Sequence, residues 1–229
     1  MTPAVPGLGD RFARVADEIA GAVASAGRSP SEITTIVVSK FQPASLVREL
    51  HALGVRDVGE NRHQEAQAKS EDLADLPDLR WHFVGQLQSK KARQVRRYAS
   101  AVHSLDRESV VRALAVDDGT IVDGFVQVAL SDEPGRGGAP VSEVERLAEL
   151  VAASPGLRLR GVMAVAPLGE PARPAFARLR EISERVRAVE PGADAISAGM
   201  SQDHADAIAE GATHLRIGTA ITGSRPAPR

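Results

Sequence analysis

Two kinds of segment alternate along the chain, and their order predicts strands separated by helices. Apolar residues recur every three or four positions from Leu8 to Val23, which predicts an amphipathic helix over residues 8–26 ending near Gly27. The next segment, residues 34–40, is rich in β-branched residues and predicts a buried strand that ends at Lys40. Pro43 then opens a second helix, since proline suits the first turn of a helix.

The later segments repeat this alternation. Further strands are expected over residues 55–59, 81–85, 101–105, 124–130, 157–166, 195–198 and 213–217. Further helices are expected over residues 43–53, 62–73, 89–98, 107–116, 142–153, 175–189 and 201–210. Ser142 and Glu145 form a capping-box pattern at the start of one helix, after a glycine-rich loop at 134–140. Parallel βαβ units follow from this order, and eight of them predict a single (β/α)8 TIM-type barrel.

Two features bear on the domain organisation. The alternative architecture is an open doubly wound sheet, but no G-x-G-x-x-G follows any expected strand. The first helix has no strand before it, and residues 223–229 are too short for a packed helix after the last strand. We therefore expect one domain over residues 1–229, with an extra N-terminal helix covering the barrel where a full eighth helix is missing. The ends, residues 1–7 and 226–229, are expected to be flexible.

Composition narrows the classes of function. With 43% hydrophobic residues among 229, the chain can bury one full core. A net charge of −2 does not favour nucleic acid or acidic membranes as partners. The absence of cysteine excludes disulfides, thiolate metal sites and a cysteine nucleophile. No apolar run has membrane-spanning length and no secretory signal opens the chain, so a cytoplasmic location is expected.

Lys40 is the first candidate for chemistry. Reactive groups of (β/α)8 barrels lie at the carboxyl ends of the strands, and Lys40 ends the first one. A neutral lysine amine there can attack an aldehyde and form a Schiff base. The alternative is a lysine that extends into solvent and only ends the strand. The strand alone favours the alternative, and the remaining strand ends reverse that preference.

Two turns near the end of the chain are candidates for binding phosphate. One is residues 199–203, where Ser201 is expected at the N-cap of a helix, and the other contains Gly218 and Thr219. Phosphate sites in barrels often follow strands seven and eight. Ordinary helix capping would explain either turn alone, but both lie beside the strand that carries Lys40. Together they favour a phosphate site.

Arg216 is expected to point into the barrel, because strand alternation then places Leu215 and Ile217 against the helices. An inward arginine needs a partner. A ligand with a ring nitrogen is one possibility, and a buried carboxylate such as Asp106 or Glu60 is the other.

The remaining polar candidates carry less weight. His82 lies in an apolar strand and is expected to be a hydrogen-bonded core histidine. The other histidines lack ligand spacing, so no metal site is expected. The basic run over residues 90–97 is expected to be a solvated helix face without nucleic-acid contacts, since no aromatic residues accompany it.

A set of short motifs, in order along residues 30–225, identifies a family resemblance. The motifs are Val38-Ser39-Lys40, Gly59-Glu60-Asn61, residues 81–85 with 87–89, Ser104-Leu105-Asp106, Gly161-Val162-Met163, Gly199-Met200-Ser201, and residues 216–221 with Gly223 and Arg225. In these the chain resembles the pyridoxal phosphate homeostasis proteins, which are similar to the barrel domain of alanine racemase. Gln86, Lys90, Gln202 and Thr222 depart from residues common in that family.

The resemblance implies roles for particular residues. It implies that pyridoxal 5′-phosphate (PLP) is attached to Lys40 as a Schiff base, with Ser201, Gly218 and Thr219 holding the phosphate. It implies that Arg216 faces the pyridine nitrogen and that Asn61 and Met163 line the cofactor. A cation beside that nitrogen keeps the nitrogen unprotonated, which disfavours carbanion chemistry.

Three functions use the same residues. The first is a homeostatic carrier that binds PLP in the cell and passes it to PLP-dependent apoenzymes without efficient turnover. The second is an amino-acid racemase with weak activity, but two-base racemisation needs a second acid or base. In related racemases that group is a tyrosine of a separate domain, and the only tyrosine here is Tyr98. The third is a lysine aldolase acting on a phosphorylated sugar, which would be colourless. Lacking the second racemase domain, the protein is expected to be a monomer.

Overall fold

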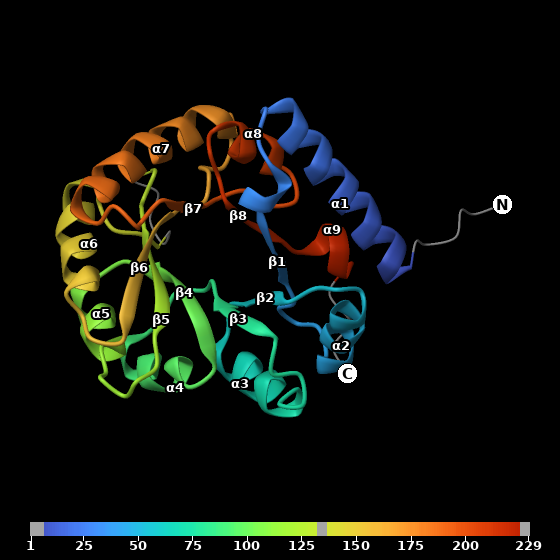
Figure 1. Cartoon of the computed structure of the whole chain (residues 1–229), viewed down its shortest axis with the longest axis horizontal. Coiled ribbons are helices and arrows are strands. Elements are labelled where there is room, and N and C mark those ends of the chain that lie inside the picture. Colours follow the sequence, from blue (N-terminus) through green and yellow to red (C-terminus); the bar gives the residue numbers. More distant parts are fainter. Residues whose placement is uncertain (1–6, 132–136, 225–229) are drawn as a thin grey trace.

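The structure, a computed structural model, describes residues 7–131 and 137–224. Its centre is a closed barrel of eight parallel strands in the order β1 to β8, with the helices outside (Figure 1). The predicted (β/α)8 barrel is therefore confirmed, and the open doubly wound sheet is excluded. The predicted flexibility of residues 1–7 and 226–229 concerns segments that, apart from Gly7, lie outside the described residues. Residues 134–136 of the 134–140 loop also lie outside them.

The strands are short and mostly begin or end one or two residues from the predicted limits. They are β1 (Thr34–Val38), β2 (Asp57–Glu60), β3 (Arg80–Phe83), β4 (Ala99–Leu105), β5 (Val122–Gln127), β6 (Leu157–Met163), β7 (Ala195–Ser197) and β8 (His214–Ile217). Strands β1 and β8 close the barrel, with Val37 opposite Ile217. Closure brings the first and last parts of the chain together.

The helices surround this barrel. They are α1 (Leu8–Ser25), α2 (Ala44–Ala52), α3 (His63–Asp72), α4 (Ala92–Arg96), α5 (Glu108–Leu114), α6 (Val144–Ala152), α7 (Ala172–Val189), α8 (His204–Ala209) and α9 (Thr219–Thr222). Short 3-10 turns at Pro30–Glu32, Ser89–Lys91 and Val141–Glu143 precede β1, α4 and α6. No helix among the described residues is long and apolar enough to cross a bilayer.

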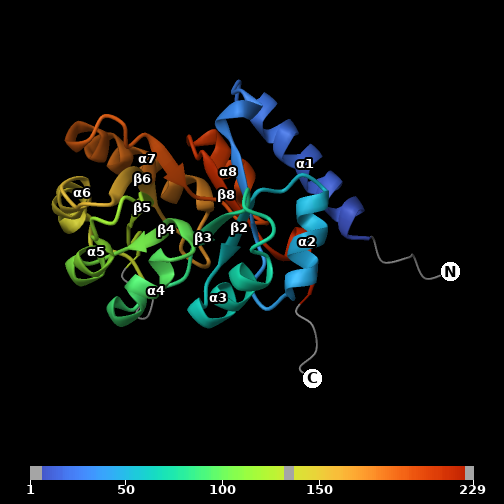
Figure 2. The ribbon, with the colours of Figure 1, turned by 60° about the horizontal axis from the view of Figure 1, so that its bottom comes forward.

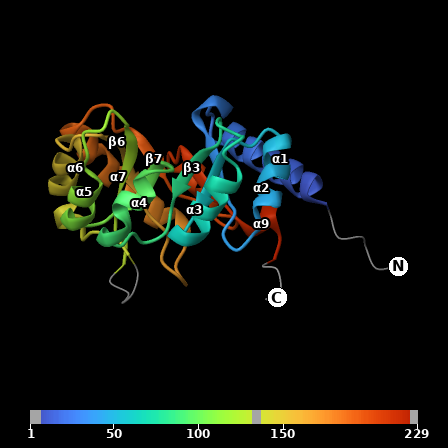
Figure 3. The same cartoon turned by 90° about the horizontal axis from the view of Figure 1, so that it is seen from below.

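Helix α1 packs beside α8 and the short α9, where a full-length helix after β8 would otherwise cover the barrel; α9 is the only helix after β8 among the described residues. Its buried stripe consists of Val15, Ile19 and Val23, as the sequence period requires. Arg11 donates from Nε to the carbonyl oxygen of Ile221 at 2.7 Å, which ties α1 to the end of α9. Figure 3 shows α1, α2 and α9 gathered on the same side of the barrel, and Figure 2 shows α1 and α2 together on that side. The four-residue α9 was not predicted from the sequence, because four residues carry no helical period.

Two predicted helix starts are wrong. The Ser142–Glu145 capping box is not formed, because residues 141–143 make a 3-10 turn and α6 begins only at Val144, with no side-chain cap at Glu143. Helix α8 begins at His204 with Asp203 in the N-cap position, so Ser201 is not an N-cap and lies in the preceding turn. In both cases the first turn of the predicted helix takes a tighter backbone form.

The core has two parts. The large part lies between the strands and the helices and includes Leu215 and Ile217, which confirms the predicted alternation of β8. The small part is a separate cluster of Ala101, Phe125, Met163 and Ala195. Several polar residues are as deeply buried as these, among them His103 and Ser197 at 0% exposure and Arg216 at 6%. Such groups require hydrogen-bond partners, which the barrel interior supplies.

Candidate functional site

The carboxyl ends of β2, β1, β8, β7 and β6 are neighbours in the closed barrel, and each carries a predicted site residue. Ser39 N donates to the Gly59 carbonyl at 2.9 Å, which sets Lys40 beside Asn61. On the other side, Val37 pairs with Ile217, so Gly218 lies beside Val38, two residues before Lys40. Arg216 N donates to the Gly199 carbonyl at 2.9 Å, which brings the two predicted phosphate turns together. Met163 follows next, paired with Ser197.

Lys40 is exposed, and the backbone around it is held in an uncommon form. Phe41, the residue after it, has φ of 65°, the left-handed value that L-residues with side chains seldom take. Two contacts support this turn. The Phe41 N–H donates to Glu65 Oε2 at 3.1 Å, and the guanidinium carbon of Arg62 lies 4.7 Å from the centroid of the Phe41 ring. The turn therefore fixes the backbone that presents the Lys40 amine.

A buried ion pair lies beneath this turn. Lys69 Nζ donates to Glu60 Oε1 at 2.5 Å and to the Ser39 carbonyl at 2.7 Å, and Ser39 Oγ donates to Glu60 Oε1 at 2.7 Å. Burial raises the pKa of Glu60, while the nearby Lys69 ammonium opposes that rise. Lys69 thus holds the peptide carbonyl that precedes Lys40. Glu60 is not the partner of Arg216 that the sequence suggested.

Asp106, the other suggested partner of Arg216, pairs with Arg107 at 2.5 Å instead. The partners of Arg216 are neutral oxygens. Its Nη1 donates to Ser197 Oγ at 2.7 Å and its Nη2 donates to the Ala164 carbonyl at 2.8 Å. Burial lowers the pKa of Arg216 to about 10. Its Nε–H donates to no residue that the structure describes and is available to a ligand.

The two predicted phosphate turns offer free backbone donors. The N–H groups of Ser201, Gly218 and Thr219 have no hydrogen-bond partner in residues 7–131 and 137–224. Gly199 has φ of 90°, and a Cβ there would meet the Ala207 Cβ at 2.7 Å, so the first turn requires glycine. Such N–H groups, with the nearby hydroxyls of Ser201 and Thr219, suit an anion.

Asn61 and Met163 lie on the two sides of this arrangement. The Oδ1 atom of Asn61 is buried and has no hydrogen-bond partner among the described residues. Buried polar atoms of this kind are uncommon in proteins without a ligand or water to satisfy them. Met163 is 2% exposed and belongs to the small core cluster with Phe125.

A polar chain inside the barrel was not predicted from the sequence. His82 was expected to be a hydrogen-bonded core histidine, and this is confirmed by contacts of 2.9 Å with Asp57 and His103. His103 in turn contacts Ser197 Oγ at 2.9 Å. Burial lowers the pKa of His103 well below its usual value. Polar residues at inward positions of neighbouring strands were the signal in the sequence that could have indicated this chain. Which of these side chains bond to one another is decided only when the barrel closes.

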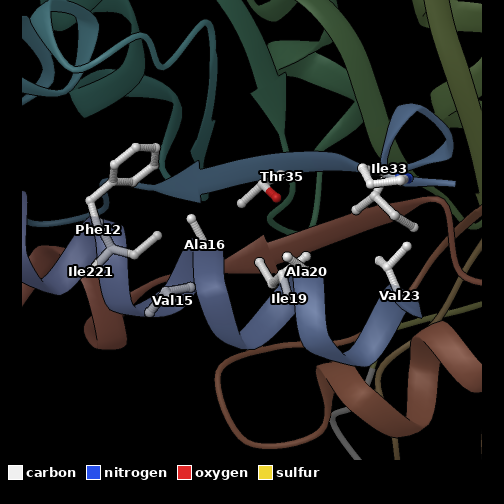
Figure 4. A pocket seen from close by; sticks show the side chains of 10 residues that line it. Phe12, Val15, Ala16, Ile19, Ala20, Val23, Ile33, Thr35 and Ile221 are labelled. Atoms are coloured by element: carbon white, nitrogen blue, oxygen red, sulfur yellow. The ribbon is translucent and has the colours of Figure 1, made fainter. Parts of the chain in front are cut away.

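A cavity of about 180 Å³ lies away from these residues, between α1 and the outer face of β1 (Figure 4). Phe12, Ala16, Ala20 and Val23 of α1 face Ile33 and Thr35 across it. Its lining is almost entirely apolar, so it does not suit a phosphate. We attribute it to the small alanines of α1, which stands where a barrel helix would otherwise pack.

A family model, related sequences and solved structures all relate this chain to the same group of proteins. Residues 27–226 match the family described as alanine racemase, N-terminal domain. The pyridoxal phosphate homeostasis protein of Pseudomonas aeruginosa is 43% identical over 224 residues, covering 95% of this chain and 96% of the relative. The protein of that description from Escherichia coli is 38% identical over 227 residues, covering 95% and 97%.

Solved structures agree. PipY of Synechococcus elongatus, solved with PLP bound, has a TM-score of 0.79 at 36% identity and covers 90% of this chain and 100% of its own. An alanine racemase from Corynebacterium glutamicum, with a TM-score of 0.71 at 14% identity over 92% of this chain and 62% of its own, shows likeness of fold alone. From these matches, the chain belongs to the pyridoxal phosphate homeostasis protein family, built on the alanine racemase N-terminal domain.

Proposed function

We propose that this protein binds PLP in the cell, holds it on Lys40 as a Schiff base, and serves to control the level of free cofactor. The observation that carries the proposal is that an exposed lysine, just after β1, lies at the same end of the barrel as three backbone N–H groups after β7 and β8 that have no partner among the described residues. PLP supplies an aldehyde for an amine and a phosphate dianion for N–H donors. The description of the relatives and the PLP-bound PipY structure support the same reading.

The donors and acceptors of the site fit this group. Ser201, Gly218 and Thr219 would hold the phosphate through N–H groups that otherwise have no partner among the described residues. Asn61, whose Oδ1 is buried and unsatisfied within the same part of the chain, would line the cofactor together with Met163. Asp203 modifies this cradle, because its Oδ1 already accepts the Met200 N–H at 2.5 Å. A carboxylate at that point disfavours a second anion there and directs the phosphate toward Gly218 and Thr219.

Arg216 would face the pyridine nitrogen and keep it unprotonated. Its charge is buried, with 6% of the residue exposed, and its bonds to the protein end on a hydroxyl and a carbonyl rather than a carboxylate. Asp203 is near enough to act on this charge but does not bond to it, and a buried cation opposes protonation of a nearby base. A ring that stays unprotonated withdraws electrons poorly, which favours storage of PLP over turnover of amino acids.

Lys40 can be tested against every other lysine of the chain, because these are only Lys69, Lys90 and Lys91. Lys69 is 7% exposed and bonded to Glu60, so its amine is engaged. Lys90 and Lys91 belong to the 3-10 turn after β3. Among these four lysines, only Lys40 lies within two residues of the end of β1, the strand that pairs with β8. One of the two predicted phosphate turns follows β8.

The test combines absorbance with chemical trapping. We expect the protein to become yellow with PLP, and borohydride followed by peptide mapping to place the cofactor on the peptide that carries Lys40. Lys40→Ala should abolish the covalent product while leaving weaker binding through the phosphate, and Lys90→Ala should behave like the parent protein. A protein that stays colourless and takes up no PLP contradicts the proposal, and unchanged trapping in Lys40→Ala contradicts the choice of lysine.

Racemase activity is the alternative predicted from the sequence, and Tyr98 does not favour it. The Tyr98 ring stacks on His63 with centroids 6.0 Å apart, and its hydroxyl is buried without a partner among the described residues. Burial raises the pKa of Tyr98, which opposes the loss of its proton. Solvent deuterium entering the α-position of alanine, with many turnovers per protein, would support the racemase instead. An aldolase would cleave a phosphorylated sugar without any PLP.

We further propose that residues 1–229 form one PLP-binding domain, that the protein is a monomer in the cytoplasm, and that PLP-dependent apoenzymes receive its cofactor. The closed barrel supports the single domain, since β1 and β8 pair with each other and leave no strand edge open within the described chain. Light scattering tests the monomer. Transfer is tested by mixing the PLP-loaded protein with an apoenzyme and comparing its reactivation with that by free PLP.

A further inference from the structure

Five side chains form one continuous hydrogen-bonded chain across the inside of the barrel. Arg216 Nη1 donates to Ser197 Oγ at 2.7 Å, and Ser197 Oγ lies 2.9 Å from His103 Nδ1. His103 Nε2 lies 2.9 Å from His82 Nδ1, and His82 Nε2 lies 2.9 Å from Asp57 Oδ1. We name these residues the barrel relay. Each is at most 8% exposed, so water does not replace its contacts.

The two ends of the barrel relay fix the direction of every bond between them. Arginine can only donate, and an ionised aspartate can only accept. Because Ser197 Oγ accepts from Arg216, its own proton goes to His103 Nδ1. His103 then carries its proton on Nε2 and donates it to His82 Nδ1, and His82 donates from Nε2 to Asp57. This single arrangement satisfies all five groups with both imidazoles neutral.

The surroundings hold the relay in this state. The His103 ring stacks on Phe125, with centroids 4.2 Å apart and an interplanar angle of 12°, which fixes the ring plane. Arg80 donates from Nε to Asp57 Oδ1 at 2.7 Å. Burial would raise the pKa of Asp57, but the bonds from His82 and Arg80 lower it to about 2, so the acceptor end stays ionised.

We propose that Ser197, His103, His82 and Asp57 are positioning residues for Arg216, which together fix the orientation of its guanidinium and thereby set the protonation of the pyridine nitrogen of bound PLP. This rests on the proposed function and adds to it the groups that regulate the electronic state of the cofactor. The reason is geometric. Arg216 has no carboxylate bonded to it in the part of the chain that the structure describes, so its orientation depends on Ser197 and the Ala164 carbonyl. The Ser197 proton is directed by the rest of the relay.

The first experiment uses the protein without PLP and does not depend on the proposed function. Nitrogen-15 spectra of the histidine rings should show His82 and His103 both neutral, each with its proton on Nε2, at neutral pH. A proton on Nδ1 of His103, or a doubly protonated His82, reverses the direction of the chain and overturns the inference. Single His→Gln substitutions at positions 82 and 103 assign the signals.

The second experiment measures the pyridine nitrogen of bound PLP labelled with nitrogen-15. The parent protein should show an unprotonated nitrogen, and Ser197→Ala should move the signal toward the protonated position. Ser104→Ala is the matched control, because Ser104 is also 0% exposed and its hydroxyl has no partner among the described residues. Ser197→Thr restores the hydroxyl and should restore the signal. A purely structural role would lower stability in Ser197→Ala and leave the ring nitrogen unchanged.

The outcomes separate the two proposals. PLP that binds to Lys40 with the same ring-nitrogen signal in Ser197→Ala and Ser104→Ala overturns the inference and leaves the proposed function standing. A parent protein that takes up no PLP overturns both. If Ser197→Ala does not fold, Asp57→Asn gives the same measurement from the other end of the relay, and the tautomers of the parent protein still decide the direction of the chain.

Discussion

Replacing Lys69 by methionine removes one half of the buried ion pair behind Lys40. Methionine keeps the unbranched stem, so packing changes little, while the ammonium that bonds to Glu60 and to the Ser39 carbonyl is lost. The Lys69 side chain is 8% exposed and the Glu60 side chain 1%. Glu60 would keep only the bond from Ser39 Oγ, and its Oε2 already lacks a partner among the described residues.

The magnitude follows from this burial. Removing one partner of a buried ion pair costs about 3–5 kcal/mol, because the remaining charge is left without compensation. The low exposure of both side chains places Lys69→Met within that range at pH 8. Burial raises the pKa of Glu60, so the folded protein binds this proton at a higher pH than the unfolded chain does. The loss caused by Lys69→Met should therefore shrink as the pH falls and Glu60 becomes protonated.

Urea unfolding of the protein without PLP measures this effect. The single tryptophan, Trp81, is 6% exposed and reports unfolding by fluorescence. The double variant Glu60→Gln with Lys69→Met removes both charges and should recover most of the stability, which gives the coupling between the two sites. A loss below about 1 kcal/mol at pH 8, or a loss that grows toward pH 5, would refute the assignment of a desolvated ion pair.

Three further predictions concern other parts of the molecule. Ala16→Leu should fill part of the cavity under α1 and stabilise the protein by about 1 kcal/mol in urea unfolding. Ala13→Leu, on the same helix but outside the cavity lining, should not, and equal effects of the two substitutions would contradict the cavity. Arg96→Lys should destabilise the protein by about 2–4 kcal/mol, because one ammonium cannot replace a guanidinium that bonds to Asp118 and four backbone carbonyls. Arg93→Lys, exposed on α4, is the control, and matching melting curves of the two variants would refute a stabilising role of the Arg96 guanidinium. Asp57→Asn should lower the free energy of unfolding by roughly 2 kcal/mol at neutral pH. The ionised carboxylate stabilises the fold, so the difference from the parent protein should disappear as the pH falls through about 2 and Asp57 becomes protonated, and a difference that stays constant with pH contradicts the lowered pKa.

Much of the fold followed from local patterns. The β-branched run ending at Lys40 and the period of α1 needed no tertiary information, because each is decided by the faces that neighbouring residues present. The inward direction of Arg216 was correct for the same reason. The start of α8 was wrong, since Gly199 takes φ of 90° against Ala207 and the turn continues to Asp203 before the helix begins.

The sequence by itself determined a (β/α)8 barrel with a lysine, two glycine turns and an inward arginine at the ends of its strands. Those properties depend on residue type and spacing over a few positions. Only the tertiary structure decided what each polar group touches: Lys69 rather than Arg216 for Glu60, and Ser197 rather than a carboxylate for Arg216. Partners of this kind come from strands far apart in the chain. Buried donors and acceptors could pair in many ways, and the actual pairs form only when barrel closure brings the strands together and excludes water.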